Sequence, residues 1–158
     1  MVQPGDDLAV LILDALTEMG EALTDDDVIV LAQKIVSKAE NRYLDLRTVT
    51  PSEEACRLAK EVDKDPRKVQ AILDESNEVV RKREGVLIVE HRLGFVQANA
   101  GIDQSNISHE EDDGDNLCLL LPVDSDTSAR ALREEIKKRT GLHVGVVINH
   151  LCNIFILF

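Results

Sequence analysis

Apolar side chains recur every three or four residues in four segments of the chain, which is the spacing of a helix with one buried face. Most of these segments also carry residues that begin or end helices. In order along the chain, these signals are Asp6-Asp7 and Gly20, the capping box Thr50-Pro51-Ser52-Glu53, Asp65-Pro66, and Asp124 with Gly141. In the capping box the proline takes the first helical position. The pattern predicts four helices, and we assign structural roles and no chemistry to the second and third.

Short continuous apolar runs lie between these helices and predict strands. The runs are Val28–Ala32, Val86–Val89, Phe95–Ala98, Leu117–Leu121 and Val144–Ile148. The second and third are separated by a short segment that contains Gly94, which is typical of a hairpin. We therefore predict a mixed α/β (α+β) fold, in which a several-stranded mixed sheet with a hairpin is covered by about four helices.

Composition narrows the classes of function. The 158 residues suffice for one domain or one domain and part of another, and 44% apolar content is enough for a real core. The formal net charge of −12 argues against a nucleic-acid binder, which needs a basic face to neutralise phosphates. The apolar runs are too short or too interrupted to span a bilayer, so we expect no membrane partner.

The three cysteines are scattered and form no CxxC pair. An odd, scattered set of this kind indicates reduced intracellular thiols and not a disulfide framework. The acidic N-terminus lacks the basic segment of a signal peptide. From these features we expect a cytoplasmic protein.

The segment Gln33–Glu40 directly follows the first predicted strand and contains Lys34 and Lys38. Two lysines and a serine at the end of a buried strand could form an anion-binding edge. The alternative is a strand that simply continues to a solvated end, and the pattern alone favours this alternative. No glycine-rich stretch precedes Lys34, so the segment is not a Walker P-loop.

The segment Asn99–Asn106 follows the predicted hairpin and carries Asp103 as its one charged residue among amides and hydroxyls. A hard carboxylate in such surroundings suits a divalent-cation site on a loop. The simpler interpretation is a hydrophilic turn, since turns favour these residue types for backbone reasons. The residue pattern alone favours the turn.

Taken together, four motifs resemble the coenzyme F420-0:L-glutamate ligases, the γ-glutamyl ligases of deazaflavin biosynthesis. They are Pro4-Gly5-Asp6-Asp7-Leu8, Gln33–Glu40, Asn99–Asn106, and Leu120-Leu121-Pro122 leading to Gly145–Asn149. The resemblance implies an F420 ligase-like fold and an intertwined homodimer. It also implies an enzyme that uses GTP and Mg²⁺ or Mn²⁺, with K⁺ as a further candidate ion, to join L-glutamate to coenzyme F420-0 through an acyl phosphate.

The same resemblance implies roles for individual residues. Asp103 would bind the divalent metal and Asn106 would contact the nucleotide, while Gln33, Lys34 and Lys38 would lie along its phosphates and sugar. A carboxylate is a suitable ligand for Mg²⁺, and lysine is a suitable charge for phosphates. The resemblance assigns no catalytic side chain.

The resemblance stops after Asn149, where the family continues with a metal-binding Asp-Thr pair. This chain has His150-Leu151 at those positions, followed by apolar residues to Phe158. We therefore expect residues 1–149 to be part of an F420:glutamate ligase-like domain and residues 150–158 to be a non-matching apolar tail. On this basis we expect a partial copy with impaired activity. The alternative is a non-catalytic module that binds a nucleotide or a partner subunit.

Overall fold

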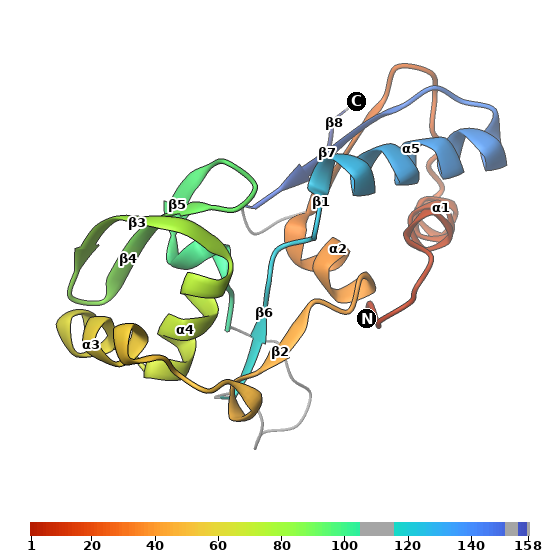
Figure 1. Ribbon diagram of the computed structural model, residues 1–158. Helices are drawn as coiled ribbons and strands as arrows, with labels where there is room; N and C mark the ends of the chain where they lie inside the picture. Colours follow the sequence, from red (N-terminus) through yellow and green to blue (C-terminus); the bar gives the residue numbers. More distant parts are fainter. Residues whose placement is uncertain (105–115, 151–154, 158) are drawn as a thin grey trace. The chain divides into compact units, whose positions relative to one another are not determined.

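The computed structural model describes residues 1–104, 116–150 and 155–157, and for the last three it describes the backbone (Figure 1). The described α-helices are α1 (Leu8–Met19), α2 (Gln33–Ala39), α3 (Glu53–Val62), α4 (Pro66–Asp74) and α5 (Ser125–Thr140), with 3₁₀-helices η1 (Leu46–Thr48) and η2 (Asn99–Gly101). The strands are β1 (Val28–Ala32), β2 (Tyr43–Asp45), β3 (Ser76–Arg83), β4 (Val86–His91), β5 (Val96–Ala98), β6 (Leu117–Leu119), β7 (Gly145–Asn149) and β8 (Phe155–Leu157). The predicted mixed α/β class is confirmed, and the strands are distributed over three sheets.

The chain divides into two compact units, each with its own core. The first unit combines Met1–Arg42 with Leu121–Phe158, and the second unit is the continuous segment Tyr43–Leu120. The two predicted halves of the nucleotide site fall in different units, so each is described within its own unit.

The first unit is built on the sheet β7-β1-β8, in which β1 pairs in parallel with β7 and antiparallel with β8. The sheet is therefore mixed, as predicted. Helices α1 and α5 pack beside each other, and α5 packs on β7 (Figure 1). The buried side chains that form this core are Ala9, Ile29, Leu31, Val36, Leu132, Ile136 and Val144.

The ends of α1 and α5 follow the predicted signals. The carboxylates of Asp7 and Asp124 accept hydrogen bonds from the first turns of the two helices, at 3.1 Å from Val10 N and 2.9 Å from Thr127 N. Both helices end at a glycine in the left-handed conformation, with φ of 75° at Gly20 and 78° at Gly141, where any other residue would be strained.

Helix α2 corrects the prediction for Gln33–Glu40, since the segment does not continue as a strand. Gln33, Val36 and Ser37 are buried, which is helical spacing, and the Gln33 amide donates to the Ser37 hydroxyl one turn later. The helix begins at Gln33 without a side-chain cap. Because the usual start signal is missing, the sequence pattern did not reveal it.

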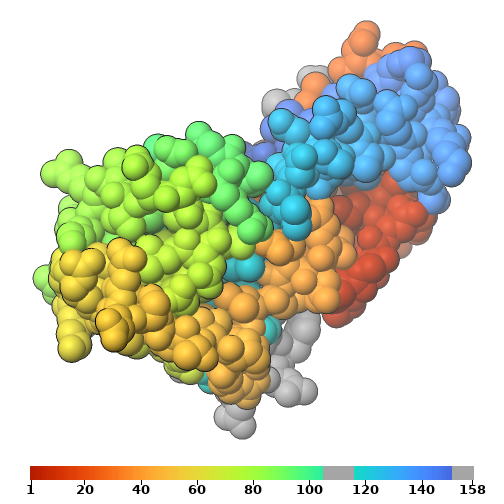
Figure 2. Space-filling model, viewed as in Figure 1, coloured from red at the N-terminus to blue at the C-terminus, as the bar shows by residue number. Residues whose placement is uncertain are grey.

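The second unit contains two sheets, β3-β4-β5 and β2-β6, with α3 and α4 packed against each other and against β3. Figure 2 shows α3 in yellow and α4 in yellow-green at the surface of this unit. The predicted hairpin is confirmed as β4 and β5, with Ile88 opposite Ala98. The fully buried side chains at the centre of this unit include Leu46, Val62, Val69, Ile72, Leu87, Val89 and Leu119.

The start of α3 differs from the predicted capping box. Ser52, and not Thr50, is the N-cap, because its hydroxyl accepts a hydrogen bond from Ala55 N at 3.1 Å. Pro51 therefore precedes the helix. The start of α4 is as predicted, with Asp65 as the N-cap and Pro66 in the first turn.

None of the described helices combines the length and the apolar content that crossing a bilayer requires. The longest of them, α5, has 16 residues, several of them charged. A membrane-spanning helix needs about 20 predominantly apolar residues.

Candidate functional site

The candidate metal-binding loop begins with the 3₁₀-helix η2. Its residues Asn99, Ala100 and Gly101 all have positive φ, at 51°, 52° and 68°. The Ala100 side chain is completely buried, and the Asn99 side chain accepts a hydrogen bond from Leu87 N on β4 at 3.3 Å. These contacts fix the path of the chain toward Asp103.

The backbone of Asp103 is bound to β6. Its N–H donates to Leu119 O at 3.0 Å, and its carbonyl accepts from Leu119 N at 2.8 Å. Since Leu119 also lies opposite Tyr43 on β2, Asp103 takes the position of a third strand beside β6. The half-buried Asp103 side chain is therefore carried by a sheet and is better fixed than a residue on an open turn.

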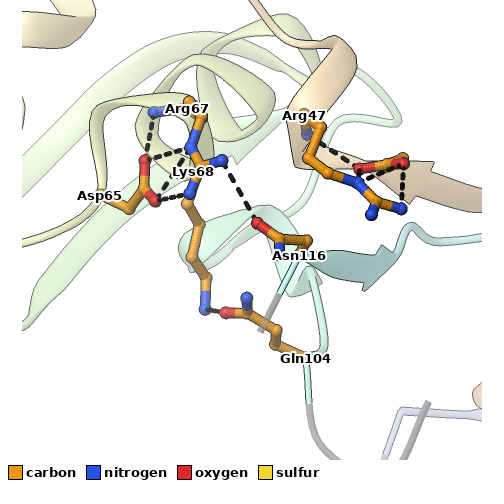
Figure 3. Close-up of polar contacts among 7 residues, drawn as sticks. Arg47, Asp65, Arg67, Lys68, Gln104 and Asn116 are labelled. Atoms are coloured by element: carbon orange, nitrogen blue, oxygen red, sulfur yellow. Dashed lines mark hydrogen bonds and ion pairs between the residues drawn. The ribbon is translucent and has the colours of Figure 1, made fainter. Parts of the chain in front are cut away.

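Gln104 connects this loop to a group of polar and charged side chains from the start of α4 and from β2 and η1, which we call the polar cluster (Figure 3). The polar cluster comprises Asp45, Arg47, Asp65, Arg67, Lys68, Gln104 and Asn116. Lys68 Nζ donates to Gln104 Oε1 at 2.7 Å, and Arg67 Nη1 donates to Asn116 Oδ1 at 3.3 Å. The residue next to the candidate metal ligand is thus held by a lysine from α4.

Each arginine of the polar cluster is paired with an aspartate two residues earlier. Arg47 Nη2 lies 2.8 Å from Asp45 Oδ2, and Arg67 Nη2 lies 2.5 Å from Asp65 Oδ2. The hydrogen bonds from these arginines hold the pKa of each aspartate below its usual value. Asp65 also caps α4, since Oδ1 accepts from Arg67 N at 2.8 Å.

The Asp65–Arg67 pair predicts a pH-dependent contribution to stability. Because the pKa of Asp65 is lowered in the folded chain, the pair stabilises fully above the usual aspartate pKa of about 3.9 and progressively less as pH falls through the lowered value. Asp65→Asn keeps a capping side chain but removes the charge. We expect it to cost about 0.5 kcal/mol of unfolding free energy at pH 7, because the pair is partly exposed to solvent, and less as the pH falls through the lowered pKa of Asp65.

Urea unfolding of both proteins at several pH values measures this difference. Asp74→Asn is a matched control, because Asp74 accepts a hydrogen bond from a neutral glutamine on the same helix. A difference for Asp65→Asn that does not change with pH would contradict the assignment to the ion pair.

The three residues predicted to lie along a nucleotide are on α2, in the first unit. Lys34 and Lys38 are one helical turn apart and half-buried, so the helix places both ammonium groups on the same face. Gln33 is only 4% exposed. The helix thus brings the two lysines together and turns Gln33 toward the core.

The Asp103 carboxylate is compatible with a Mg²⁺ or Mn²⁺ ion whose other ligands come from a substrate. Within residues 1–104, 116–150 and 155–157, no three His, Cys, Asp or Glu side chains form a metal-binding group. Mg²⁺ is commonly held by one or two carboxylates together with substrate phosphates, so the Asp103 carboxylate can supply the protein's share. The other predicted contact, Asn106, lies outside the described residues.

The buried thiol of Cys118 lies between the charges of this region. Burial raises its pKa, the Lys68 ammonium lowers it, and the carboxylates of Asp65 and Asp103 raise it further. A thiol with a raised pKa carries less of the nucleophilic thiolate form at neutral pH. Cys56 and Cys118 are both free, and Cys152 lies outside the described residues.

Sequence reasoning missed the basic side chains of α4. Arg67 and Lys68 were included in a helix with a structural role, but they contact Asn116 and Gln104, the residues that flank the undescribed segment 105–115. One feature of the sequence could have indicated their role. Both lie in the first turn of the helix, where the helix dipole disfavours positive charge.

Comparison with known proteins supports the resemblance suggested by the four motifs. A family described as F420-0:Gamma-glutamyl ligase matches residues 1–153. The chain is 46% identical over 149 residues to the coenzyme F420:L-glutamate ligase of Methanothermobacter thermautotrophicus, which covers 94% of this chain and 57% of the relative. It is 41% identical over 147 residues to the ligase of the same name from Methanopyrus kandleri, covering 93% of this chain and 54% of the relative.

A third relative, the coenzyme F420:L-glutamate ligase of Methanocaldococcus jannaschii, is 42% identical over 127 residues, covering 80% of this chain and 48% of the relative. The chain thus spans about half the length of the curated relatives that it matches. The predicted resemblance is confirmed, and the chain belongs to the F420-0:gamma-glutamyl ligase family.

Proposed function

We propose that this chain takes part in a ligase reaction that joins L-glutamate to coenzyme F420-0 with GTP and Mg²⁺ or Mn²⁺. The family match over residues 1–153 carries this proposal. The position of Asp103 supports it, because a carboxylate fixed beside β6 is a suitable ligand for a nucleotide-bound metal.

In the proposed reaction a carboxylate oxygen of F420-0 attacks the γ-phosphorus of GTP, and the bond between this phosphorus and the bridging oxygen breaks to release GDP. The glutamate amine then attacks the carbonyl carbon of the acyl phosphate. A C–N bond forms, the C–O bond to phosphate breaks, and the amine loses a proton to solvent. No covalent enzyme nucleophile is needed, so the protein acts by positioning and by electrostatic stabilisation.

The proposed roles of the side chains follow from their charges. Asp103 would hold the metal, which when bound neutralises negative charge on the transferred phosphoryl group. Lys34 and Lys38 would bind phosphate oxygens, since both ammonium groups lie on one face of α2. Gln33 and Asn106 remain proposed nucleotide contacts.

Metal removal tests the proposal without requiring turnover. We expect purified chain to bind GTP in the presence of MnCl₂, and EDTA to weaken that binding at least tenfold, because the metal links Asp103 to the phosphates. Isothermal titration calorimetry with GTP, with and without EDTA, measures this effect. Equal GTP affinity in both conditions would contradict a metal-dependent site.

A second assay separates catalysis from binding. Purified chain is incubated with GTP, MnCl₂, L-glutamate and F420-0, and mass spectrometry follows the glutamylated product. Product formation supports a ligase, whereas metal-dependent GTP binding without product supports the alternative of a non-catalytic nucleotide-binding module. Light scattering on the same sample tests the proposed homodimer.

A further inference from the structure

Lys68 differs from the other cations of the polar cluster in the kind of partner that holds it. Arg47 and Arg67 are each paired with an aspartate, which neutralises their charge. Among the described residues, the hydrogen-bond partner of the Lys68 ammonium is the neutral side-chain oxygen of Gln104. An amide orients the ammonium group without cancelling its charge, and among the described residues its other two N–H donors have no hydrogen-bond acceptor.

The position of Lys68 lowers the stability of helix α4, which carries it. Lys68 is in the first turn of α4, where the dipole disfavours cations, and the half-buried Lys64 lies nearby. Burial first, and then the charge of Lys68, lower the pKa of Lys64. Two lysines that repel each other at the start of a helix lower the stability of that helix. Residues that lower local stability in this way are expected at functional sites.

Lys68 and the candidate metal ligand belong to the same part of the second unit. Figure 3 shows the Lys68 ammonium group bonded to the side chain of Gln104, and Gln104 directly follows Asp103 in the sequence. The charges of Lys68 and Asp103 also both act on the buried thiol of Cys118 in β6. A carboxylate suited to a metal and an ammonium group suited to an anion therefore both lie near Cys118 of β6.

We propose that Lys68, held by Gln104, forms an anion-binding subsite beside Asp103 that takes an oxyanion of the substrates, either a carboxylate or a phosphate. The proposal rests on the proposed ligase function, whose substrates all carry such groups. Lysine binds oxyanions as a point charge and accepts either geometry. The subsite assigns the α4 helix a role in binding in addition to its structural one.

Three variants and three probes test the subsite. Lys68→Met removes the charge and keeps most of the side-chain length, and Lys68→Arg keeps the charge. Lys60→Met is the matched control, because Lys60 is an exposed lysine on the adjacent helix α3. The probes are L-glutamate, inorganic phosphate, and GTP with MnCl₂, each titrated by calorimetry at low salt.

We expect Lys68→Met to weaken the binding of L-glutamate or of phosphate at least tenfold, and the probe affected identifies the oxyanion. Lys68→Arg should bind within about threefold of wild type, and Lys60→Met should be indistinguishable from it. Equal binding of both anions by wild type and Lys68→Met overturns the subsite, as does wild-type chain that binds neither anion. GTP binding that needs Mn²⁺ in those same samples leaves the metal–nucleotide site of the proposed function intact, whereas the absence of such binding in the wild-type chain counts against that function.

A measurement on the wild-type chain tests the subsite without relying on correct folding of the variants. In ¹⁵N-resolved spectra, the anion that binds should shift the amide signals of Lys68 and Gln104 before those of Lys60. If the amide signals of Lys68 and Gln104 do not shift at a saturating anion concentration, the subsite is contradicted, whatever the variants show.

Discussion

Asp103→Asn is expected to lower the affinity of the chain for GTP in the presence of MnCl₂ by about 100-fold, which corresponds to about 2.8 kcal/mol. The substitution keeps the size of the side chain and both backbone hydrogen bonds to Leu119. It removes the negative charge, and a neutral amide is a much poorer ligand than a carboxylate for a hard divalent cation. Calorimetric titration of GTP into wild type and variant measures the difference.

Asp63→Asn provides the matched control. Asp63 is exposed at the end of α3 with a φ of 50°, a conformation that asparagine adopts readily. It removes the same charge from the same unit and should leave GTP affinity within about twofold of wild type. An Asp103→Asn variant that is folded and binds GTP as tightly as this control would exclude Asp103 as the metal ligand.

The parts of the fold that the sequence predicted well are those with signals at their ends. Helices α1 and α5 begin at a capping aspartate and end at a glycine with positive φ, and α4 begins at Asp65-Pro66. Strands β1 and β7 were predicted from their continuous apolar runs, and they pair in parallel. These signals act locally, so a single sequence contains them.

The elements that were missed depend on contacts between distant segments. Strand β3 is mostly exposed and half of its residues are charged, and its structure comes from pairing with β4. Strand β2 has three residues and exists because β6 pairs with it from more than 70 positions away. Helix α2 has no side-chain cap and is defined by the burial of Val36 and Ser37.

In the candidate site, too, local features were predictable from the sequence and contacts between distant segments were not. The loop around Asp103 was predicted from its residue types, but its attachment to Leu119 could not be, because this pairing crosses the chain. The contact between Lys68 and Gln104 spans 36 residues and joins a helix to the loop. Periodicity indicates which face of α4 is buried, but it does not indicate what its polar side chains contact.

Ala100→Val is expected to reduce the free energy of unfolding by about 2–4 kcal/mol. Ala100 has a φ of 52°, a conformation in which a β-branched side chain is strongly disfavoured. Its side chain is fully buried in the core of the second unit, and added methyl groups in such a site cost about 1–3 kcal/mol. The two penalties have separate causes and therefore add. Urea unfolding followed by circular dichroism measures the loss.

Two controls separate these causes. Ala100→Gly relieves the backbone strain but removes a buried methyl group, so these effects oppose each other and the stability should remain within about 1 kcal/mol of wild type. Ala98→Val makes the same side-chain change two residues earlier, at an exposed position of strand β5 where valine is favoured, and should change the stability by less than about 0.5 kcal/mol. If Ala100→Val were as stable as Ala98→Val, the left-handed, buried conformation of η2 would be wrong. The path that brings the chain to Asp103 would then need another explanation.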